Sequence, residues 1–92
     1  MVFNWNNDKN EKLKVSRGIS FEDVVIAIEN GDVLDIVENS SKKYKHQTVI
    51  VINFQNYAYA VPTVKKTGEF FFKTIFPSRK YTAKYLKGKN NG

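Results

Sequence analysis

The residues best suited to chemistry lie in the run Pro77-Ser78-Arg79-Lys80-Tyr81 near the C-terminus. Pro77 ends a predicted strand and Ser78 is a preferred helix N-cap, so Arg79 and Lys80 fall in the first turn of a predicted helix. The helix dipole disfavours cations there, and a bound anion would remove the conflict. A guanidinium, an ammonium and free backbone N–H groups could together bind one phosphate. The alternative is that both cations are simply exposed to solvent.

Further basic and aromatic residues near the C-terminus are also suited to binding a polyanion. Tyr81 and Tyr85 are one helical turn apart, and they could pack on the domain or stack against bases. Lys84 lies beside Tyr85 in the chain. Lys73 is a cation in an otherwise apolar predicted strand, so it either faces solvent or lines a site. These residue types in this order favour contact with a polyanion.

His46 is the only histidine, and the chain has no cysteine. One imidazole without thiolates cannot build a zinc site, so we expect neither a metal nor a cofactor. The favoured interpretation of His46 is a solvated loop histidine beside the basic cluster Lys42–Lys45, which includes Lys43. The sequence contains no nucleophile elbow and no glycine-rich phosphate loop, which argues against hydrolases of those classes.

Net charge is distributed unevenly along the chain. Residues 1–64 carry seven Lys or Arg and eight Asp or Glu, whereas residues 65–92 carry eight Lys or Arg and only Glu69. Six of the acids lie between positions 20 and 38, a segment without a base. Such a basic pole indicates a nucleic acid or an acidic partner, and the alternative is a solubilising tail.

The 92 residues are enough for one domain and too few for two. With 41% hydrophobic and 14% aromatic residues, the chain can fill one modest core. We expect a single domain over residues 1–92, with an ordered core of about 3–87 and a polar tail at 88–92. Apolar runs such as Val49–Ile52 are far too short to cross a bilayer, and Met1–Glu11 is polar. We therefore expect a soluble, cytoplasmic protein.

Two helices are predicted in the first third of the chain. The first covers about residues 8–16, with Asn7 as its N-cap and Gly18 at its end. The second begins at Ser20 with an S-x-x-D variant of the capping box and ends at Gly31. Its apolar stripe comprises Phe21, Val24, Val25 and Ile28.

The remainder is predicted as four strands and a final helix. Gln55-Asn56 is predicted to form a hairpin turn between two strands. Pro62 indicates an edge strand or a β-bulge. In the last strand, alternation places Phe70, Phe72 and Phe76 on one face. The fold class is α+β, in the order α-α-β-β-β-β-α, with helices packed on a four-stranded antiparallel sheet. The predicted strands are 33–38, 48–54, 57–64 and 69–76, and the final helix is about 79–87.

Three short motifs in this order resemble the BrnT family, the RelE-like toxins of bacterial type II toxin–antitoxin modules. They are Phe3-Asn4-Trp5-Asn6 followed by Lys9, Arg17-Gly18-Ile19-Ser20-Phe21-Glu22, and Ser78-Arg79-Lys80. The likeness covers about residues 3–86, and its specificity comes from order and spacing. The family often has Lys-His-Gly where this chain has Ser16-Arg17-Gly18, so no histidine role is carried over to that place.

The resemblance implies a small RelE-like domain that cleaves RNA without a metal and is inhibited by a cognate antitoxin, often of ribbon-helix-helix type. The expected substrate is mRNA, on or off the ribosome, cleaved by attack of its own 2′-OH. Two alternatives remain open: a non-catalytic RNA-binding module, and a protein-interaction domain with a basic pole. The expected catalytic residues are Arg79 as phosphate clamp, Lys80 and Lys73 as electrostatic partners, Tyr81 for stacking or proton transfer, and His46. The expected RNA-binding residues are Lys84, Tyr85, Lys43 and Lys45.

Overall fold

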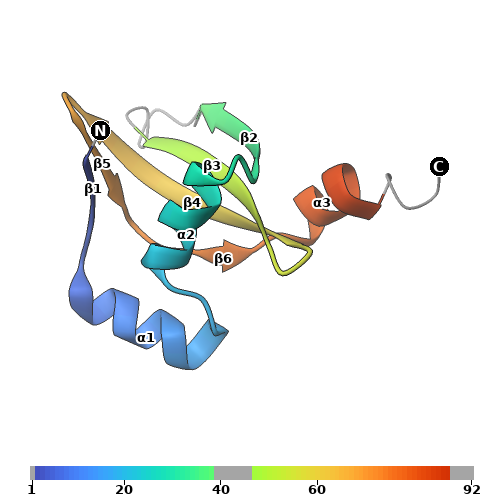
Figure 1. Ribbon diagram of the computed structural model, residues 1–92, viewed down its shortest axis with the longest axis horizontal. Helices are drawn as coiled ribbons and strands as arrows, with labels where there is room; N and C mark the ends of the chain where they lie inside the picture. Colours follow the sequence, from blue (N-terminus) through green and yellow to red (C-terminus); the bar gives the residue numbers. More distant parts are fainter. Residues whose placement is uncertain (1, 39–46, 88–92) are drawn as a thin grey trace.

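The structure is a computed structural model that describes residues 2–38 and 47–87. Within these ranges the chain forms an α+β domain in which two helices precede most of the sheet and a third helix follows it (Figure 1). The elements in chain order are β1 (Val2–Trp5), α1 (Asn7–Arg17), α2 (Phe21–Glu29), β2 (Val33–Glu38), β3 (Gln47–Phe54), β4 (Tyr57–Lys66), β5 (Glu69–Phe72), β6 (Phe76–Pro77) and α3 (Arg79–Thr82), which continues as a π-helical segment (Ala83–Lys87).

The six strands form one mixed sheet in the order β1-β5-β4-β3-β2, with β6 paired to β4. The pairs β2–β3, β3–β4 and β4–β5 are antiparallel, as predicted. The prediction of four strands is wrong, because β1 and β6 also join the sheet. The prediction of a wholly antiparallel sheet is also wrong, because β1 runs parallel to β5.

β1 is the strand that the sequence analysis missed. Phe3 and Trp5 are alternate residues of β1, opposite Phe70 and Phe72 of β5. The ring centroids of Phe3 and Phe70 are 5.9 Å apart, and those of Trp5 and Phe72 are 6.2 Å apart. A four-residue strand shows too little alternation to be recognised without its partner.

α1 and α2 begin and end at recognisable cap residues. The side chain of Asn6, and not that of Asn7, caps α1 by accepting a hydrogen bond from the Lys9 N–H, so the helix starts one residue earlier than predicted. Gly18 ends α1 at a φ of 66°, in the left-handed region that glycine tolerates best. The predicted capping box of α2 at Ser20 and Asp23 is present.

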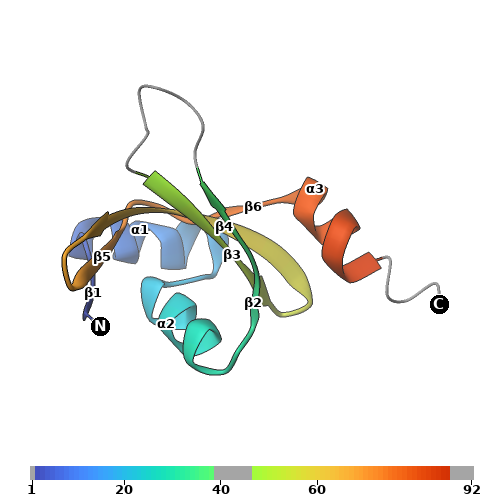
Figure 2. The same cartoon turned by 90° about the horizontal axis from the view of Figure 1, so that it is seen from above.

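α2 packs its apolar stripe against one face of the sheet (Figure 2). Phe21 and Val24 are fully buried, as the periodicity predicts, and Ala27 joins them. Val25 and Ile28 are half-buried and contact the edge of the same core. The rest of this core comprises Leu13, Ile19, Ile50, Ile52, Val61, Phe72 and Ile75.

The β3–β4 hairpin is the longest pairing in the sheet. Its two-residue turn, Gln55-Asn56, has positive φ at both positions (52° and 65°), as a type I′ turn requires. Phe54 and Tyr57 face each other across the turn. This confirms the predicted hairpin.

The predicted last strand is interrupted by a one-residue slip. Phe72 lies opposite Thr63, whereas Phe76 lies opposite Ala60, so one extra residue separates β5 from β6. The Lys73 N–H still donates to the Pro62 carbonyl at 2.8 Å, which places the bulge beside Pro62. The slip reverses the alternation, so the prediction that Phe76 shares a face with Phe72 is wrong. Phe76 is 40% exposed and Ile75 is buried in its place.

Residues 79–87 form one continuous helical segment, here called the C-terminal helix, which matches the predicted range. In Figure 1 it lies at the opposite end of the domain from α1 and β1. Among the described residues, no helix is long and apolar enough to cross a membrane.

Candidate nucleic-acid interface

The C-terminal helix is attached to the start of β4 by its first turn. The Ser78 N–H donates to the Ala58 carbonyl at 2.8 Å, and the Ala58 N–H donates to Thr82 Oγ1 at 2.8 Å. Ser78 Oγ accepts from the Tyr81 N–H, which confirms Ser78 as the N-cap. Thr82 and Ala58 are buried, so this anchor belongs to the core.

The exposed part of the same helix alternates cations and aromatic rings. Tyr81 and Tyr85 stack with centroids 6.1 Å apart and an interplanar angle of 18°. Lys80 Nζ lies 5.6 Å from the Tyr81 centroid, and Lys84 Nζ lies 5.1 Å from the Tyr85 centroid. We call these four residues the tyrosine ladder. All four are predicted site residues. The two lysines are four positions apart, as are the two tyrosines, and residues four positions apart lie on the same side of a helix.

Arg79 precedes the ladder directly and is exposed to solvent. Its side chain makes no hydrogen bond or ion pair with any residue in the described ranges 2–38 and 47–87. An arginine offers an anion two parallel N–H donors.

Asp35 of β2 reaches the far end of the ladder and was not singled out from the sequence. The Tyr85 hydroxyl donates to one oxygen of the Asp35 carboxylate, and the Ile36 N–H donates to the other at 2.8 Å. The hydrogen bond from Tyr85 lowers the pKa of Asp35 below its ordinary value. The same bond raises the pKa of Tyr85, and a hydrogen bond with Tyr85 raises that of Lys84. A contact between residues fifty positions apart leaves no local signal in the sequence.

Lys73 is exposed, with its Nζ 5.5 Å from the Phe71 ring centroid. Its backbone N–H is bonded to Pro62 of β4, whereas Ser78 is bonded to Ala58. Four residues along a strand correspond to about 13 Å. No contact among the described residues joins Lys73 to the C-terminal helix, so the structure does not bring it to Arg79. The predicted candidates His46, Lys43 and Lys45 lie outside the described residues.

Arg17 is a second residue that the sequence analysis did not place in a site. Its guanidinium donates to the carbonyl of Ile75, in the bulge between β5 and β6. The end of α1 is thereby attached to the segment that leads into the C-terminal helix. The two residues are 58 positions apart, which again leaves no local signal.

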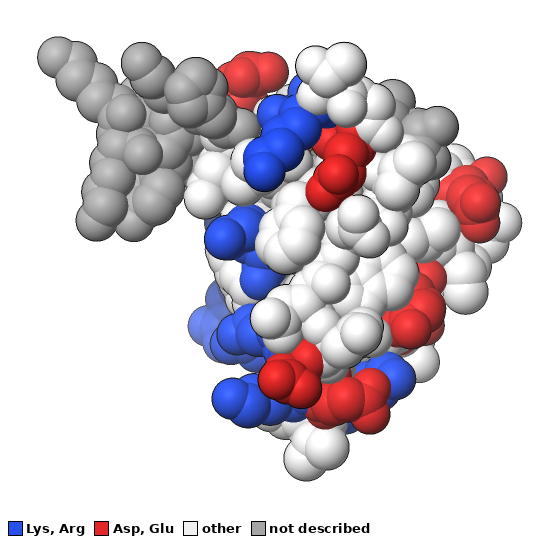
Figure 3. All heavy atoms as spheres, turned by 90° about the vertical axis from the view of Figure 1, so that its left-hand side faces the viewer, with Lys and Arg blue, Asp and Glu red and all other residues white. Residues whose placement is uncertain are grey.

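Basic residues form a row on one face of the domain. Seen from the side of β1 and α1, Lys and Arg gather along one edge and most Asp and Glu lie below and along the other, with some acids beside the cations at the top (Figure 3). The C-terminal helix carries four cations and no acid. Asp35 is therefore a carboxylate brought to this helix from another element.

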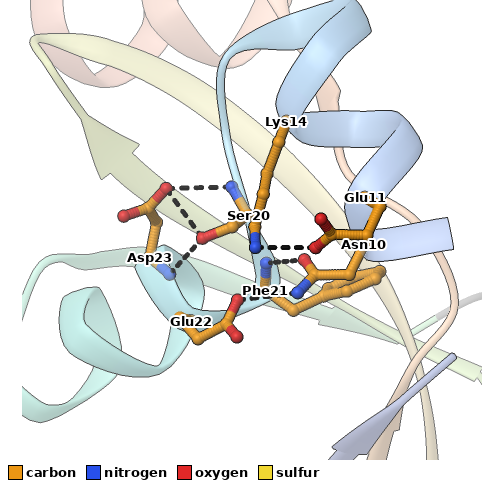
Figure 4. Close-up of polar contacts among 7 residues, drawn as sticks. All are labelled: Asn10, Glu11, Lys14, Ser20, Phe21, Glu22 and Asp23. Carbon is orange, nitrogen blue, oxygen red and sulfur yellow. Dashed lines mark hydrogen bonds and ion pairs between the residues drawn. The ribbon is translucent and has the colours of Figure 1, made fainter. Parts of the chain in front are cut away.

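A second polar cluster, the α1–α2 corner, joins the first two helices (Figure 4). Asn10 donates to Glu22 Oε1 at 2.7 Å and accepts from the Phe21 N–H at 2.7 Å. The Asp23 carboxylate accepts from the N–H and the hydroxyl of Ser20. Asn10 is only 3% exposed, and the carboxylates are committed to caps and tethers, so this corner supports the fold and offers no reactive group.

Within the described ranges, no three His, Asp or Glu side chains lie close enough together to hold a metal ion. The candidate site therefore consists of the tyrosine ladder and Arg79, with Asp35 at one end. Comparison of the chain with protein-family models, with curated proteins and with solved structures finds no match.

Proposed function

We propose that this protein is a RelE-like toxin of the BrnT type, a ribonuclease that needs no metal ion. Its target is single-stranded RNA, and its site is the exposed side of the C-terminal helix. The three sequence motifs that resemble the family support the class. The location of one of them, Ser78-Arg79-Lys80, at the start of the candidate site supports the assignment of the site.

The observation that carries the proposal is the tyrosine ladder next to Arg79. Three cations and two stacked rings occupy seven consecutive residues on the surface of the domain. Cations bind the phosphates of RNA, and aromatic faces accept its unstacked bases. A helix that merely kept the protein in solution would need the charges but not the stacked rings.

The chemistry proposed for the site uses the substrate's own 2′-OH. Its oxygen bonds to the adjacent phosphorus, the bond from phosphorus to the 5′-oxygen breaks, and a 2′,3′-cyclic phosphate and a 5′-hydroxyl result. Arg79 stabilises the additional negative charge on the phosphate oxygens, with Lys80 as its neighbour. Tyr81 and His46 are the candidates for moving the proton from the 2′-OH and for supplying one to the leaving oxygen.

The proposed partner of the free toxin is a small antitoxin, of ribbon-helix-helix type in the family that the chain resembles. Covering Arg79 and the tyrosine ladder would block access of RNA, which is the simplest form of inhibition. Arg79→Glu should then weaken antitoxin binding as well as activity. Unchanged affinity would place inhibition on another surface.

A non-catalytic RNA-binding module is the second candidate. It is favoured by the composition of the ladder, whose lysines and rings bind RNA without needing to transfer a proton. Both candidates predict RNA binding that weakens steeply with salt, whereas a protein-interaction domain does not. Cleavage of RNA by purified, antitoxin-free protein distinguishes the first candidate from the second.

Arg79→Ala tests the proposal most directly. We expect RNA cleavage to fall by about a hundredfold, the scale of a lost electrostatic donor in a transition state. Unfolding free energy should stay within about 0.5 kcal/mol of wild type, because the side chain is exposed and makes no hydrogen bond or ion pair with a described residue. Arg79→Lys should recover part of the activity, since an ammonium cannot make the bidentate contact.

Lys12→Ala is the matched control, because it removes an exposed cation from α1, at the other end of the domain. It should leave cleavage, growth arrest and the melting curve unchanged. Full toxicity of Arg79→Ala would overturn the site. Loss of toxicity together with unfolding would make Arg79 a structural residue.

A further inference from the structure

Among the described residues, the C-terminal helix is hydrogen-bonded to the rest of the domain at two places, one near each end. The first is the buried anchor at Thr82 and Ala58. The second is the hydrogen bond from Tyr85 to Asp35, near the other end of the helix. No residue of the π-helical segment Ala83–Lys87 is buried, although the segment also lies against β4. Among the described residues, the side chain of Tyr85 makes the hydrogen bond that ties this last turn to β2.

The carboxylate of Asp35 is itself fixed in orientation. The register of β2 against β3 shifts between Val33 and Asp35, and such a bulge re-aims the side chain that follows it. The Ile36 N–H then occupies one carboxylate oxygen, which leaves the other for the Tyr85 hydroxyl. Backbone geometry on β2 therefore defines where the Tyr85 ring lies.

A carboxylate at this position is unfavourable for RNA binding in simple electrostatic terms. The helix carries Lys80, Lys84 and Arg79, and a negative charge among them repels phosphates and lowers the local positive potential. Its presence is understandable if the hydrogen bond that it accepts contributes more than the charge costs. What the hydrogen bond can contribute is a fixed position for the two rings. Because Tyr85 stacks on Tyr81, holding one ring in place holds both.

We propose that Asp35 is a positioning residue, which holds the tyrosine ladder in the single arrangement that accepts the bases of single-stranded RNA. Asp35 touches no substrate in this role and acts through the Tyr85 hydroxyl. The proposal rests on the proposed function for its RNA, but the contact itself can be tested without RNA. The lowered pKa of Asp35 and the raised pKa of Tyr85 agree with a hydrogen bond formed in the folded state.

The first experiment measures attachment of the helix in the absence of RNA. Limited trypsin digestion reports the opening of the last turn through cleavage after Lys84 and Lys87, with cleavage after Lys12 in α1 as the internal control. We expect Tyr85→Phe and Asp35→Ala to speed cleavage after Lys84 by about tenfold and to leave cleavage after Lys12 unchanged. Equal cleavage after Lys84 in wild type and both variants would overturn the proposal.

The second experiment measures binding of a short single-stranded RNA oligonucleotide at fixed salt. Tyr85→Phe keeps the ring and removes only the hydroxyl, and Asp35→Asn keeps an acceptor and removes only the charge. We expect Tyr85→Phe and Asp35→Ala each to weaken binding by about tenfold and Asp35→Asn to weaken it less. The double variant Asp35→Ala/Tyr85→Phe should be no worse than either single variant, because both remove the same bond.

Asp32→Asn is the control for charge, since it removes a carboxylate from the same acidic segment without touching the ladder. Tighter RNA binding by Asp35→Ala, with Tyr85→Phe equal to wild type, would show that Asp35 acts only as a repelling charge and would overturn the proposal. If wild type cuts RNA and every variant at Asp35 and Tyr85 cuts it alike, only the positioning role fails. If wild type neither binds nor cuts RNA, the proposed function fails and the positioning role fails with it.

Discussion

The α1–α2 corner and the contact between Asp35 and Tyr85 use the same kind of bond in two different settings. In each, a carboxylate accepts a hydrogen bond from a neutral side chain on another element. In the corner, Glu22 is exposed, but Asn10 is buried and also accepts a buried hydrogen bond from the Phe21 N–H, whereas Asp35 and Tyr85 are both half-exposed. Water cannot replace the buried bond to Asn10, so its loss weakens the whole fold. A bond at the surface can open locally, so its loss changes the order of one segment.

The two regions also differ in what remains unpaired. In the corner, the side-chain oxygen and amide nitrogen of Asn10 both bond to α2, and the N–H and hydroxyl of Ser20 both bond to Asp23 in the helix that Ser20 caps. On the C-terminal helix, the side chains of Arg79 and Lys80 make no hydrogen bond or ion pair with a described residue. The polar corner and the proposed site therefore belong to helices at opposite ends of the domain, α1 and α3, as Figure 1 shows.

The largest expected effect in the corner comes from Asn10→Ala. It removes the bond to the Glu22 carboxylate and leaves the buried Phe21 N–H without an acceptor. We expect a loss of about 2–4 kcal/mol in unfolding free energy, measured by urea denaturation. Asn7→Ala is the control on the same helix and should change stability by less than about 0.5 kcal/mol. Equal stability of the two variants would contradict the structural role of the corner.

Thr82→Val tests whether the first turn of the C-terminal helix behaves like the corner. The change preserves shape but leaves the buried Ala58 N–H without its acceptor. We expect a loss of about 1–3 kcal/mol in unfolding free energy. Thr82→Ser keeps the hydroxyl and should retain most of the stability. If both variants unfold alike, the methyl group and not the hydrogen bond anchors this turn.

Acid should weaken the corner through Glu22. The hydrogen bond from Asn10 lowers the pKa of Glu22 below its ordinary 4.5, and Lys14 acts in the same direction. A carboxyl whose folded pKa is lowered stabilises the fold above its unfolded pKa, and this contribution is lost as pH falls through the folded pKa. Unfolding free energy of wild type should thus decline below about pH 4.5. Asn10→Ala should flatten that decline, and a parallel decline in both proteins would exclude Glu22 as its source.

The smallest effect is expected at the ion pair between Lys14 and Glu11. The two charges lie 2.7 Å apart on α1, but their side chains are 46% and 70% exposed. Water and salt screen such a pair. Lys14→Met should therefore melt within about two degrees of wild type in differential scanning calorimetry. A larger drop would show that surface pairing, and not burial, determines the stability of the corner.

Local patterns in the sequence were sufficient for the elements that carry their own signals. α2 has a capping box and a stripe of period 3.6, and the β3–β4 hairpin has a two-residue turn between two strands. The final helix begins at Arg79, after the predicted Ser78 cap. Each signal is contained within about ten residues, so no knowledge of the rest of the fold is needed.

The missed features depend on contacts between distant segments. β1 is recognisable only beside β5, and the register slip before Phe76 is defined only against β4. Asp35 becomes part of the candidate site only because β2 passes the end of the C-terminal helix. The position of Arg79, Lys80 and Tyr81 at the start of the final helix could be predicted from the sequence. The residue that hydrogen-bonds to Tyr85, Asp35, could not.

The extra residue between β5 and β6 makes the length of this segment as important as its composition. Phe72 and Ile75 enter the same core although they are three positions apart, which a regular strand does not allow. Substitution of Thr74 changes one side chain, but deletion of Thr74 would remove the extra residue itself and leave Ile75 two positions after Phe72, as in a regular strand. The bulge in which the Ile75 carbonyl accepts from Arg17 would then be lost. Among relatives of this protein, gaps in this segment should therefore be far rarer than changes of residue type.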